Sequence, residues 1–446
     1  MYKSILLFAF LLILGLSSCA SYRTIAVRPE SQPLGKEFAK LEPGSESSTE
    51  SEFKGTLSLR DALSLALTRN PGLAVFSYEM RIQEANALQA SLFPNPELDA
   101  EVENFAGSSS LNGFQGSEFT LSVGQLIELG GKRQKRTQVA VLGADLAAWD
   151  YEAAKLNIFV DVVTMFTEVL VVQQRINLQN ELVNVAEAFL QTIQQRVKAG
   201  RVSPAEAIRA KVVLSTTKID LERLYKELQS ARKRLAATWG SIEPQFDSAI
   251  GNLDTVFSLP ALEQLYPLIS KNPDIGRWAV EMQQRDAELA LEKAQRIPDP
   301  VIGGGYRRLN ESGDNAIVMG ISLPLLFFNR NKGNIQAAEY RKLQVAQQKR
   351  AVEIVLNTRL AEIYNTLSAS YNEITTLRKN VIPEAKNAFD LINKGYLMGK
   401  FGFLEVLDTQ RTLFEVRSQH LNVLKEYHQD VAKMERLIGQ KLSDIR

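Results

Sequence analysis

The chain has 446 residues, and its 52 Lys and Arg against 51 Asp and Glu leave a net charge of +1. This balance excludes a basic nucleic-acid-binding body, so we expect no nucleic-acid partner. The single cysteine cannot form a disulfide within the chain, and with only two histidines a Cys- or His-rich metal site is also excluded. We therefore expect no structural metal and no cofactor.

The N-terminus has the parts of a secretory signal. Lys3 precedes an apolar run of ~12 residues, which is followed by small residues. The run is too short to span a bilayer of ~30 Å as a helix. The tetrapeptide Leu-Ser-Ser-Cys that ends at Cys19 resembles a bacterial lipobox, in which the cysteine becomes the acylated N-terminus. We predict a lipoprotein signal peptide over 1–18 and lipidation of Cys19; the alternative is an ordinary signal peptide with a chance cysteine. Ala20, in place of Asp, favours the outer membrane.

The rest of the chain has no obvious membrane helix. Residues 19–56 are polar, which predicts a lipidated tether between the anchor and the body. No later stretch approaches ~18 consecutive apolar residues. A crossing of the membrane would therefore have to use β-strands in a closed barrel.

The chain repeats itself. Asn70-Pro71 recurs as Asn272-Pro273, and Pro94-Asn95-Pro96 recurs as Pro298-Asp299-Pro300. Motifs in the same order at nearly equal offsets indicate duplication of a unit of about 200 residues, too long for a solenoid repeat. Each unit predicts a short and a medium helix, two strands, a very long helix, a glycine turn and another medium helix. The predicted segments are a first repeat over 57–240, a connecting segment over 241–258, a second repeat over 259–440 and a C-terminal tail over 441–446.

The long helix is the clearest element. Lys132 to Ala199 contains no proline and one glycine, and at 1.5 Å per residue it would span roughly 100 Å. Apolar residues from Val139 to Val163 step by three and four, which is a heptad seam. A second seam over 159–169, displaced by one residue, predicts neighbours on two sides.

The second repeat predicts a matching helix over 334–394, with a kink at Pro383. Gly200 can end the first long helix, and Ser203 with Pro204 suits the start of the next one. The counterpart of this turn is 398–403, so both long helices end in tight reversals.

Four segments alternate with period two and predict strands: 97–103, 119–124, 301–308 and 317–323. The first has one wholly acidic face, made by Glu97, Asp99, Glu101 and Glu103. Four strands cannot close a membrane barrel, which needs about eight, and lipid does not tolerate an open edge. Either the strands form a soluble sheet, or three chains share one barrel of twelve strands. Arg307 and Arg308 could partly offset the charge of the acidic strand, but we prefer to interpret them as surface charge.

At this point the sequence resembles the TolC family of outer-membrane efflux proteins over about 57–440. The residues that carry the resemblance are Asn70-Pro71, the two Pro-x-Pro pairs, Glu128-Leu129-Gly130-Gly131-Lys132-Arg133, Phe328-Asn329-Arg330-Asn331-Lys332-Gly333-Asn334 and Leu404-Glu405-Val406-Leu407-Asp408. Two of these motifs, the one that begins at Glu128 and the one that begins at Phe328, look most like the CzcC-like heavy-metal efflux branch.

The resemblance implies a mainly α fold with a small β part. Internally duplicated long coiled-coil helices would form a trimeric α-helical barrel, and four strands per chain would contribute to a shared twelve-stranded membrane β-barrel. The implied partners are two further copies in a homotrimer, outer-membrane lipid, a periplasmic membrane-fusion adaptor and, through the adaptor, an inner-membrane RND-type pump. The implied location is the cell outer membrane, lipid-anchored and extending into the periplasm.

The resemblance also implies site residues. The adaptor would meet the hairpin tips at Gly200, Arg201, Ser203, Gly399, Lys400 and Phe401, although the aromatic residue could instead pack within its own tip. Asp390 is the candidate for the periplasmic gate, with a solvated helix face as the alternative. In a trimer the acidic strand would supply twelve carboxylates to the lumen, which favours cations. The equally weighted alternative is the ordinary polarity of a lumen face, since drug and protein exporters also carry acidic residues there.

We expect a passive exit duct and no enzyme, because no nucleophile–base pair, metal-ligand spacing or cofactor fingerprint is visible. His420 and His428 are interpreted as surface or seam residues. The cargo is expected to be heavy-metal cations, with drug efflux or type I protein secretion as alternatives. A periplasmic coiled-coil scaffold without a transport role is a further alternative.

Overall fold

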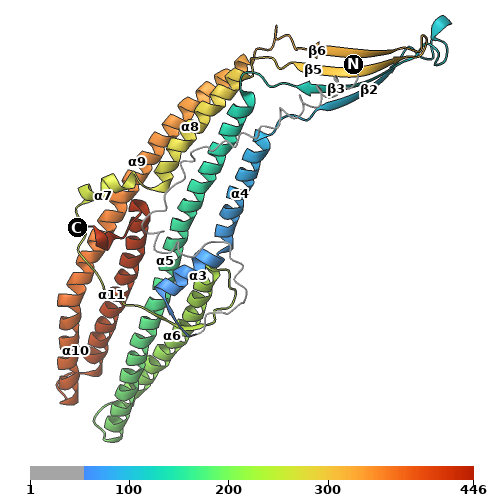
Figure 1. The fold of residues 1–446 in the computed structure, drawn as a ribbon. Coiled ribbons are helices and arrows are strands. Elements are labelled where there is room, and N and C mark those ends of the chain that lie inside the picture. The colour runs from blue at the N-terminus through green and yellow to red at the C-terminus, as the bar shows by residue number, and fades with distance from the viewer. Residues whose placement is uncertain (1–54, 446) are drawn as a thin grey trace.

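The computed structural model describes residues 55–445. The signal peptide over 1–18, Cys19 and nearly all of the predicted tether lie outside these residues. The described chain is elongated, with long helices side by side and a sheet projecting from one end (Figure 1).

The two repeats follow the same order of helices and strands, except that η1 occurs only in the first and the long helix of the second is divided into α9, η2 and α10. The first consists of α3 Leu59–Arg69, α4 Pro71–Ser91, β2 Glu97–Glu103, η1 Ser109–Leu111, β3 Glu118–Leu126, α5 Lys132–Lys198 and α6 Pro204–Ala237. The second consists of α7 Leu262–Ile269, α8 Pro273–Ala294, β5 Val301–Leu309, β6 Asn315–Ser322, α9 Lys332–Thr376, η2 Leu377–Val381, α10 Ile382–Leu397 and α11 Phe403–Ile438. The chain ends with η3 Leu442–Asp444.

The helix α5 is unbroken over 67 residues, as predicted. One side of it packs on α8, where Leu142 and Leu146 meet Val280 and Ala287. Another side, including Phe166, enters the main core with residues of α3 and α11. The prediction of neighbours on two sides is therefore confirmed. Among the helices described, α5 alone is long and apolar enough to cross a membrane, but 56% of its most apolar window is buried in the structure. Packing therefore accounts for much of this apolar character.

The second long helix is interrupted where the sequence predicts only a kink. The α-helix α9 passes into a π-helical turn over Leu377–Val381, and α10 begins at Ile382. Pro383 lies in the first turn of α10. A proline has no N–H to donate to the preceding turn, and the wider π turn accommodates that loss.

Each medium-helix pair is stacked end to end through an Asn-Pro motif. Asn70 accepts a hydrogen bond from Leu73 N at 2.8 Å and donates its amide to Thr238 O, at the end of α6, at 2.7 Å. In the second repeat, Asn272 donates to Arg436 O and Leu437 O at 2.9 and 2.8 Å. The repeated motif therefore joins the helix that leads to the sheet with the helix that returns from the turn.

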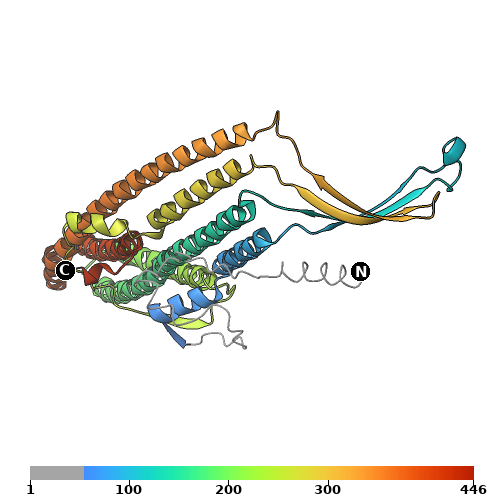
Figure 2. The ribbon, with the colours of Figure 1, turned by 45° about the horizontal axis from the view of Figure 1, so that its top comes forward.

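Four strands form one antiparallel sheet in the order β2-β3-β5-β6. The helices α4, α5, α8 and α9 lead into it side by side, in the same order (Figure 2). All four strands are those predicted, with β2 at its predicted bounds and the ends of the others shifted by at most two residues.

A second, two-stranded sheet was not predicted. β1 Gly55–Ser58 pairs in parallel with β4 Phe246–Ile250, which lies in the segment between the repeats. Leu57 and Phe246 are almost fully buried there. These strands are short and lie far apart in the sequence, so local alternation gives little sign of them.

Candidate functional site

The four-stranded sheet has two chemically different faces. The register places Leu98 opposite Val123, Val123 opposite Gly304, and Gly304 opposite Met319. Neighbouring rows on this face are also largely apolar, and Ile317, Met319 and Ile321 have 75–86% of their surface exposed. The apolar residues of this face, called the apolar face below, are Leu98, Ala100, Val102, Phe119, Leu121, Val123, Ile302, Gly304, Tyr306, Ile317, Met319 and Ile321. Three polar residues, Gln125, Arg308 and Asn315, lie on the same side of the sheet.

The opposite face carries the predicted acidic strand beside small residues. Glu97 lies in one row with Gly124, Gly303 and Gly320. The next row contains Asp99, Ser122, Gly305 and Val318. Glycine and serine leave open space over the sheet, so these carboxylates project without a bulky neighbour.

Arg307 is partly exposed but also pairs with acidic residues, so for this residue the structure supports the offset of the acidic strand rather than surface charge alone. Its guanidinium lies 3.1 Å from Glu118 and 3.4 Å from Glu103, and its Nε donates to Thr120 Oγ1 at 2.9 Å. Arg308 faces away from this cluster and donates to Asn315 at 3.1 Å. Cross-strand pairing brings Arg307 to the acids, which its position in the sequence does not reveal.

Glu97, Asp99 and Glu101 have no ion-pair partner within residues 55–445. The charge on this face is therefore graded along the strands. The end near the helices carries unpaired carboxylates, and the distal end is partly neutralised by Arg307.

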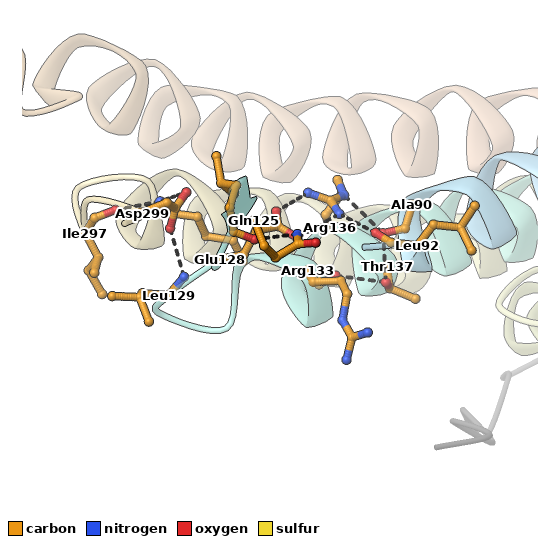
Figure 3. A network of polar contacts seen from close by, with 12 residues as sticks. Ala90, Leu92, Gln125, Glu128, Leu129, Arg133, Arg136, Thr137, Ile297 and Asp299 are labelled. Atoms are coloured by element: carbon orange, nitrogen blue, oxygen red, sulfur yellow. Dashed lines mark hydrogen bonds and ion pairs between the residues drawn. The ribbon is translucent and has the colours of Figure 1, made fainter. Parts of the chain in front are cut away.

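The junction between helices and sheet is a dense polar network (Figure 3). Lys132, at the start of α5, donates to Asp299 Oδ2 at 2.7 Å and Ile297 O at 2.5 Å. Asp299 Oδ1 accepts from Leu129 N at 2.8 Å. Lys132 is only 9% exposed. The first repeat is thus fastened to the Pro-x-Pro segment of the second.

The segment around the start of α5 also contacts the end of α4, within the first repeat. Arg136 pairs with Glu128 at 2.5 Å and donates to Ala90 O at 3.0 Å. Gly130 has φ of +70°, and a Cβ there would lie 2.6 Å from Ile297 Cδ1. The glycine is therefore required both by the backbone turn and by close packing.

The second repeat has an equivalent junction at the start of α9. Its lysine has no partner in the described part of the chain. Asn331 takes the left-handed conformation at the start of α9 and donates to Glu292 Oε2 at 2.6 Å. Lys332 follows it, as Lys132 follows Gly131, but Lys332 is exposed. It has no hydrogen-bond or ion-pair partner in the described part of the chain.

The predicted tip residues lie at the ends of the two helical hairpins. Gly200 and Gly399 adopt φ of +68° and +76°. Ser203 caps α6 by accepting from Ala205 N at 3.2 Å, and Arg201 and Lys400 are exposed.

The two tips are joined within the chain. Arg196 donates to Tyr396 O and Leu397 O at 3.0 and 2.8 Å. Phe401 is 40% exposed, and one side of its ring lies against Gly395. The ring therefore packs partly within its own tip, and its other side is open to a partner.

Asp390 is exposed on α10, and the residues described include no hydrogen-bond or ion-pair partner for it. Its role as a gate stays a prediction.

Three titratable side chains near the middle of the molecule, His420, His428 and Glu435, are half-buried. His428 Nε2 lies 2.8 Å from Leu253 O, and burial lowers the pKa of both His428 and His420. Burial raises the pKa of Glu435 to about 7, although Glu435 accepts from Leu442 N at 2.9 Å. Sequence reasoning missed Glu435 because nothing local marks it as buried. Within residues 55–445 no group of three His, Cys, Asp or Glu could hold a metal ion.

Comparisons with known proteins agree with this architecture. A family model described as outer membrane efflux protein matches residues 62–241 and 265–440. The chain is 34% identical over 389 residues to the cobalt-zinc-cadmium resistance protein CzcC of Cupriavidus metallidurans, covering 87% of this chain and 91% of that protein.

Two solved structures have a similar fold. A membrane protein from Pseudomonas aeruginosa superposes with a TM-score of 0.74 at 18% identity, covering 89% of this chain and 98% of that one. CusC, whose structures concern folding and transmembrane channel formation, gives 0.73 at 16% identity, covering 93% and 98%. The chain belongs to the outer membrane efflux protein family, as the resemblance predicted, and is an efflux channel of the outer membrane that extends into the periplasm.

Proposed function

We propose that this chain forms the passive exit duct of a tripartite efflux system and conducts heavy-metal cations to the exterior. Three copies would surround one pore, with twelve strands in the membrane and a helical barrel below. A periplasmic adaptor and an inner-membrane RND-type pump would deliver the cargo.

One observation carries the proposal: the two-faced sheet with two open edges. Its apolar face suits lipid, and its acidic face suits a water-filled interior. Four strands cannot close by themselves, and the unpaired edges β2 and β6 would be costly in lipid. Closure by further copies satisfies both edges.

The cargo is inferred from the negative charge of the acidic face and from the similarity to CzcC. Three carboxylates per chain, at Glu97, Asp99 and Glu101, have no ion-pair partner on the open face within residues 55–445. A ring of such groups attracts cations and repels anions. The name of the relative CzcC refers to cobalt, zinc and cadmium, which are divalent metals.

The adaptor is proposed to dock at the hairpin tips. Arg201 and Lys400 offer exposed charge there, and the open side of Phe401 offers an apolar contact. Asp390, on α10 shortly before the second tip, is proposed as a gate residue.

The test uses a strain in which the gene has been deleted, complemented with the wild type or with a triple variant, Glu97→Gln, Asp99→Asn and Glu101→Gln. The matched control carries Glu222→Gln, Glu263→Gln and Glu426→Gln, which are exposed helical positions outside the sheet. Cell-associated zinc, cobalt and cadmium are measured together with drug susceptibility and the amount of trimer.

We expect metal to accumulate in the deletion strain, the wild type and control to restore export, and the acidic-face variant to restore it several-fold less well. Normal metal content with increased drug sensitivity would reject the metal cargo and retain the duct. Equal export by the two triple variants would remove the acidic face from the mechanism.

A further inference from the structure

The sheet and the row of helices in a single chain each have two unpaired edges, and we call a place where two such edges meet a seam. The strands β2 and β6 are the edges of the sheet, and α4 and α9 are the outer helices of the row that leads into it. Between these edges lies a complete seam, where β3 of the first repeat pairs with β5 of the second. The helices beside it, α5 and α8, also pack together.

Because the chain is duplicated, this inner seam can serve as a template for the open one. Glu97 pairs with Gly124 in the first repeat, and Val301 pairs with Ser322 in the second. Thus β2 corresponds to β5, with Glu97 matching Val301. Likewise β3 corresponds to β6, with Gly124 matching Ser322. The contact of β3 with β5 then becomes a contact of β6 with β2 of the next copy.

Translating the observed pairs gives a definite register. The inner pair Val123–Gly304 becomes Ile321 opposite Ala100, and Leu121–Tyr306 becomes Met319 opposite Val102. By the same translation Gln125–Ile302 becomes Leu323 opposite Leu98.

The translated register keeps the two faces of the sheet separate, as the inner pairs do. Ile321 and Met319 of β6 meet apolar-face residues of β2, while Asp99 meets Ser322 and Glu101 meets Gly320. Ile317 falls opposite Asn104, just beyond the end of β2. A shift by one residue would place Ile321 beside a carboxylate, because side chains alternate between faces.

The polar junction translates in the same way. Lys132 donates to Ile297 O and Asp299 across the inner seam. Its counterpart Lys332 is exposed at the edge of the chain, and the counterparts of the acceptors are Phe93 O and Asn95.

We propose that copies of this chain join with β6 antiparallel to β2 of the next copy, pairing Ile321 with Ala100. In the same seam, Lys332 of one copy binds the Phe93–Asn95 segment of the next. This inference rests on the trimer of the proposed function and adds its register and its polar lock. The free carboxylates of β2 are then flanked by small neutral residues on both sides, with no cation from the neighbouring strand.

Cysteine cross-linking tests the register directly, because Cys19 is the only native cysteine. The seam pair is Ala100→Cys with Ile321→Cys, and the shifted control is Val102→Cys with Ile321→Cys. The inner-seam control is Leu121→Cys with Tyr306→Cys, which should cross-link without raising the mass. Membranes are oxidised and analysed by non-reducing electrophoresis, and the assembly of each variant is measured separately by native mass.

We expect at least ~10-fold more covalent dimer and trimer from the seam pair than from the shifted pair, because a disulfide cannot bridge Cα atoms more than about 7 Å apart. A stronger product from the shifted pair, or none from the seam pair in an intact trimer, would overturn the register and leave the proposed function standing. Native mass showing only monomer would overturn both.

The polar lock is tested by Asn95→Asp, which restores the acidic partner that Lys132 has in Asp299. We expect the trimer to dissociate at a higher temperature in detergent, and Lys332→Met to abolish that gain. A gain that persists in the double variant would reject the lock.

Discussion

The two repeats share one plan and differ in where they place charge and where they bend. The first carries the acidic strand β2 and a helix, α5, that is unbroken over 67 residues. The second carries three consecutive glycines in β5 and a π-helical interruption before α10. The first repeat therefore has an acidic strand and an unbroken long helix, whereas the second has a glycine-rich strand with two arginines and an interrupted long helix.

The two junction lysines show the same divergence. Lys132 is buried between the repeats, while Lys332 is exposed at the edge of the chain. Their positions in the repeat are equivalent, so the difference comes from what lies beside them. One seam is completed within the chain, and the other requires a neighbour.

The largest expected effect comes from breaking the inner junction. Asp299→Ala leaves the Lys132 ammonium buried without its carboxylate, which costs about 3–5 kcal/mol of unfolding free energy. Lys332→Met in the second repeat should cost less than about 1 kcal/mol in the monomer, because that side chain is exposed. Denaturant unfolding of the monomeric protein in detergent compares the two variants, because in the proposed trimer Lys332 would bind the next copy.

A control separates the charge from the packing at this junction. The double variant Lys132→Met with Asp299→Leu removes both charges together, and should recover much of the loss. Equal midpoints for Asp299→Ala and Lys332→Met would show that the two junctions do not differ as described.

The second prediction concerns the C-terminal ends of α6 and α11, the helices that follow the two glycine turns. Gly240 and Gly439 follow α6 and α11 with φ of +78° and +73°, so Glu435 corresponds to the buried Ala236. With a pKa of about 7 in the folded state, Glu435 keeps its proton where the unfolded chain, near 4.5, has lost it. Stability should therefore fall as the pH rises from about 4.5 to 7, by about 3 kcal/mol in total.

Glu435→Gln should remove most of this fall, since the amide oxygen can still accept from Leu442 N. Melting temperatures at pH 5 and pH 8 measure it, with the exposed Glu426→Gln on the same helix as the control. An unchanged pH dependence in Glu435→Gln would locate the titrating group elsewhere.

Much of the fold could be predicted because its signals are local. Heptad steps, alternating strands and the Asn-Pro and Pro-x-Pro motifs each act within a few residues, and they led to the correct helices and strands. The parallel pair β1–β4, the burial of Glu435 and the ion pairs of Arg307 depend on contacts between distant segments. Periodicity carries no information about such contacts, which explains why these features were missed.

The smallest effect concerns Arg307, the one cation that strands β2, β3, β5 and β6 carry on the acidic face. Arg307→Gln should change stability by less than about 1 kcal/mol, because its ion pairs are partly exposed. It should nevertheless release Glu103 and Glu118 and extend the unpaired carboxylates toward the distal end. The preference for cations should therefore rise, opposite to the effect of neutralising Glu97, Asp99 and Glu101. Reversal potentials of open channels in planar bilayers measure this, with Arg308→Gln as the control on the apolar face. A fall in cation preference would mean that Arg307, rather than the carboxylates, sets the local field.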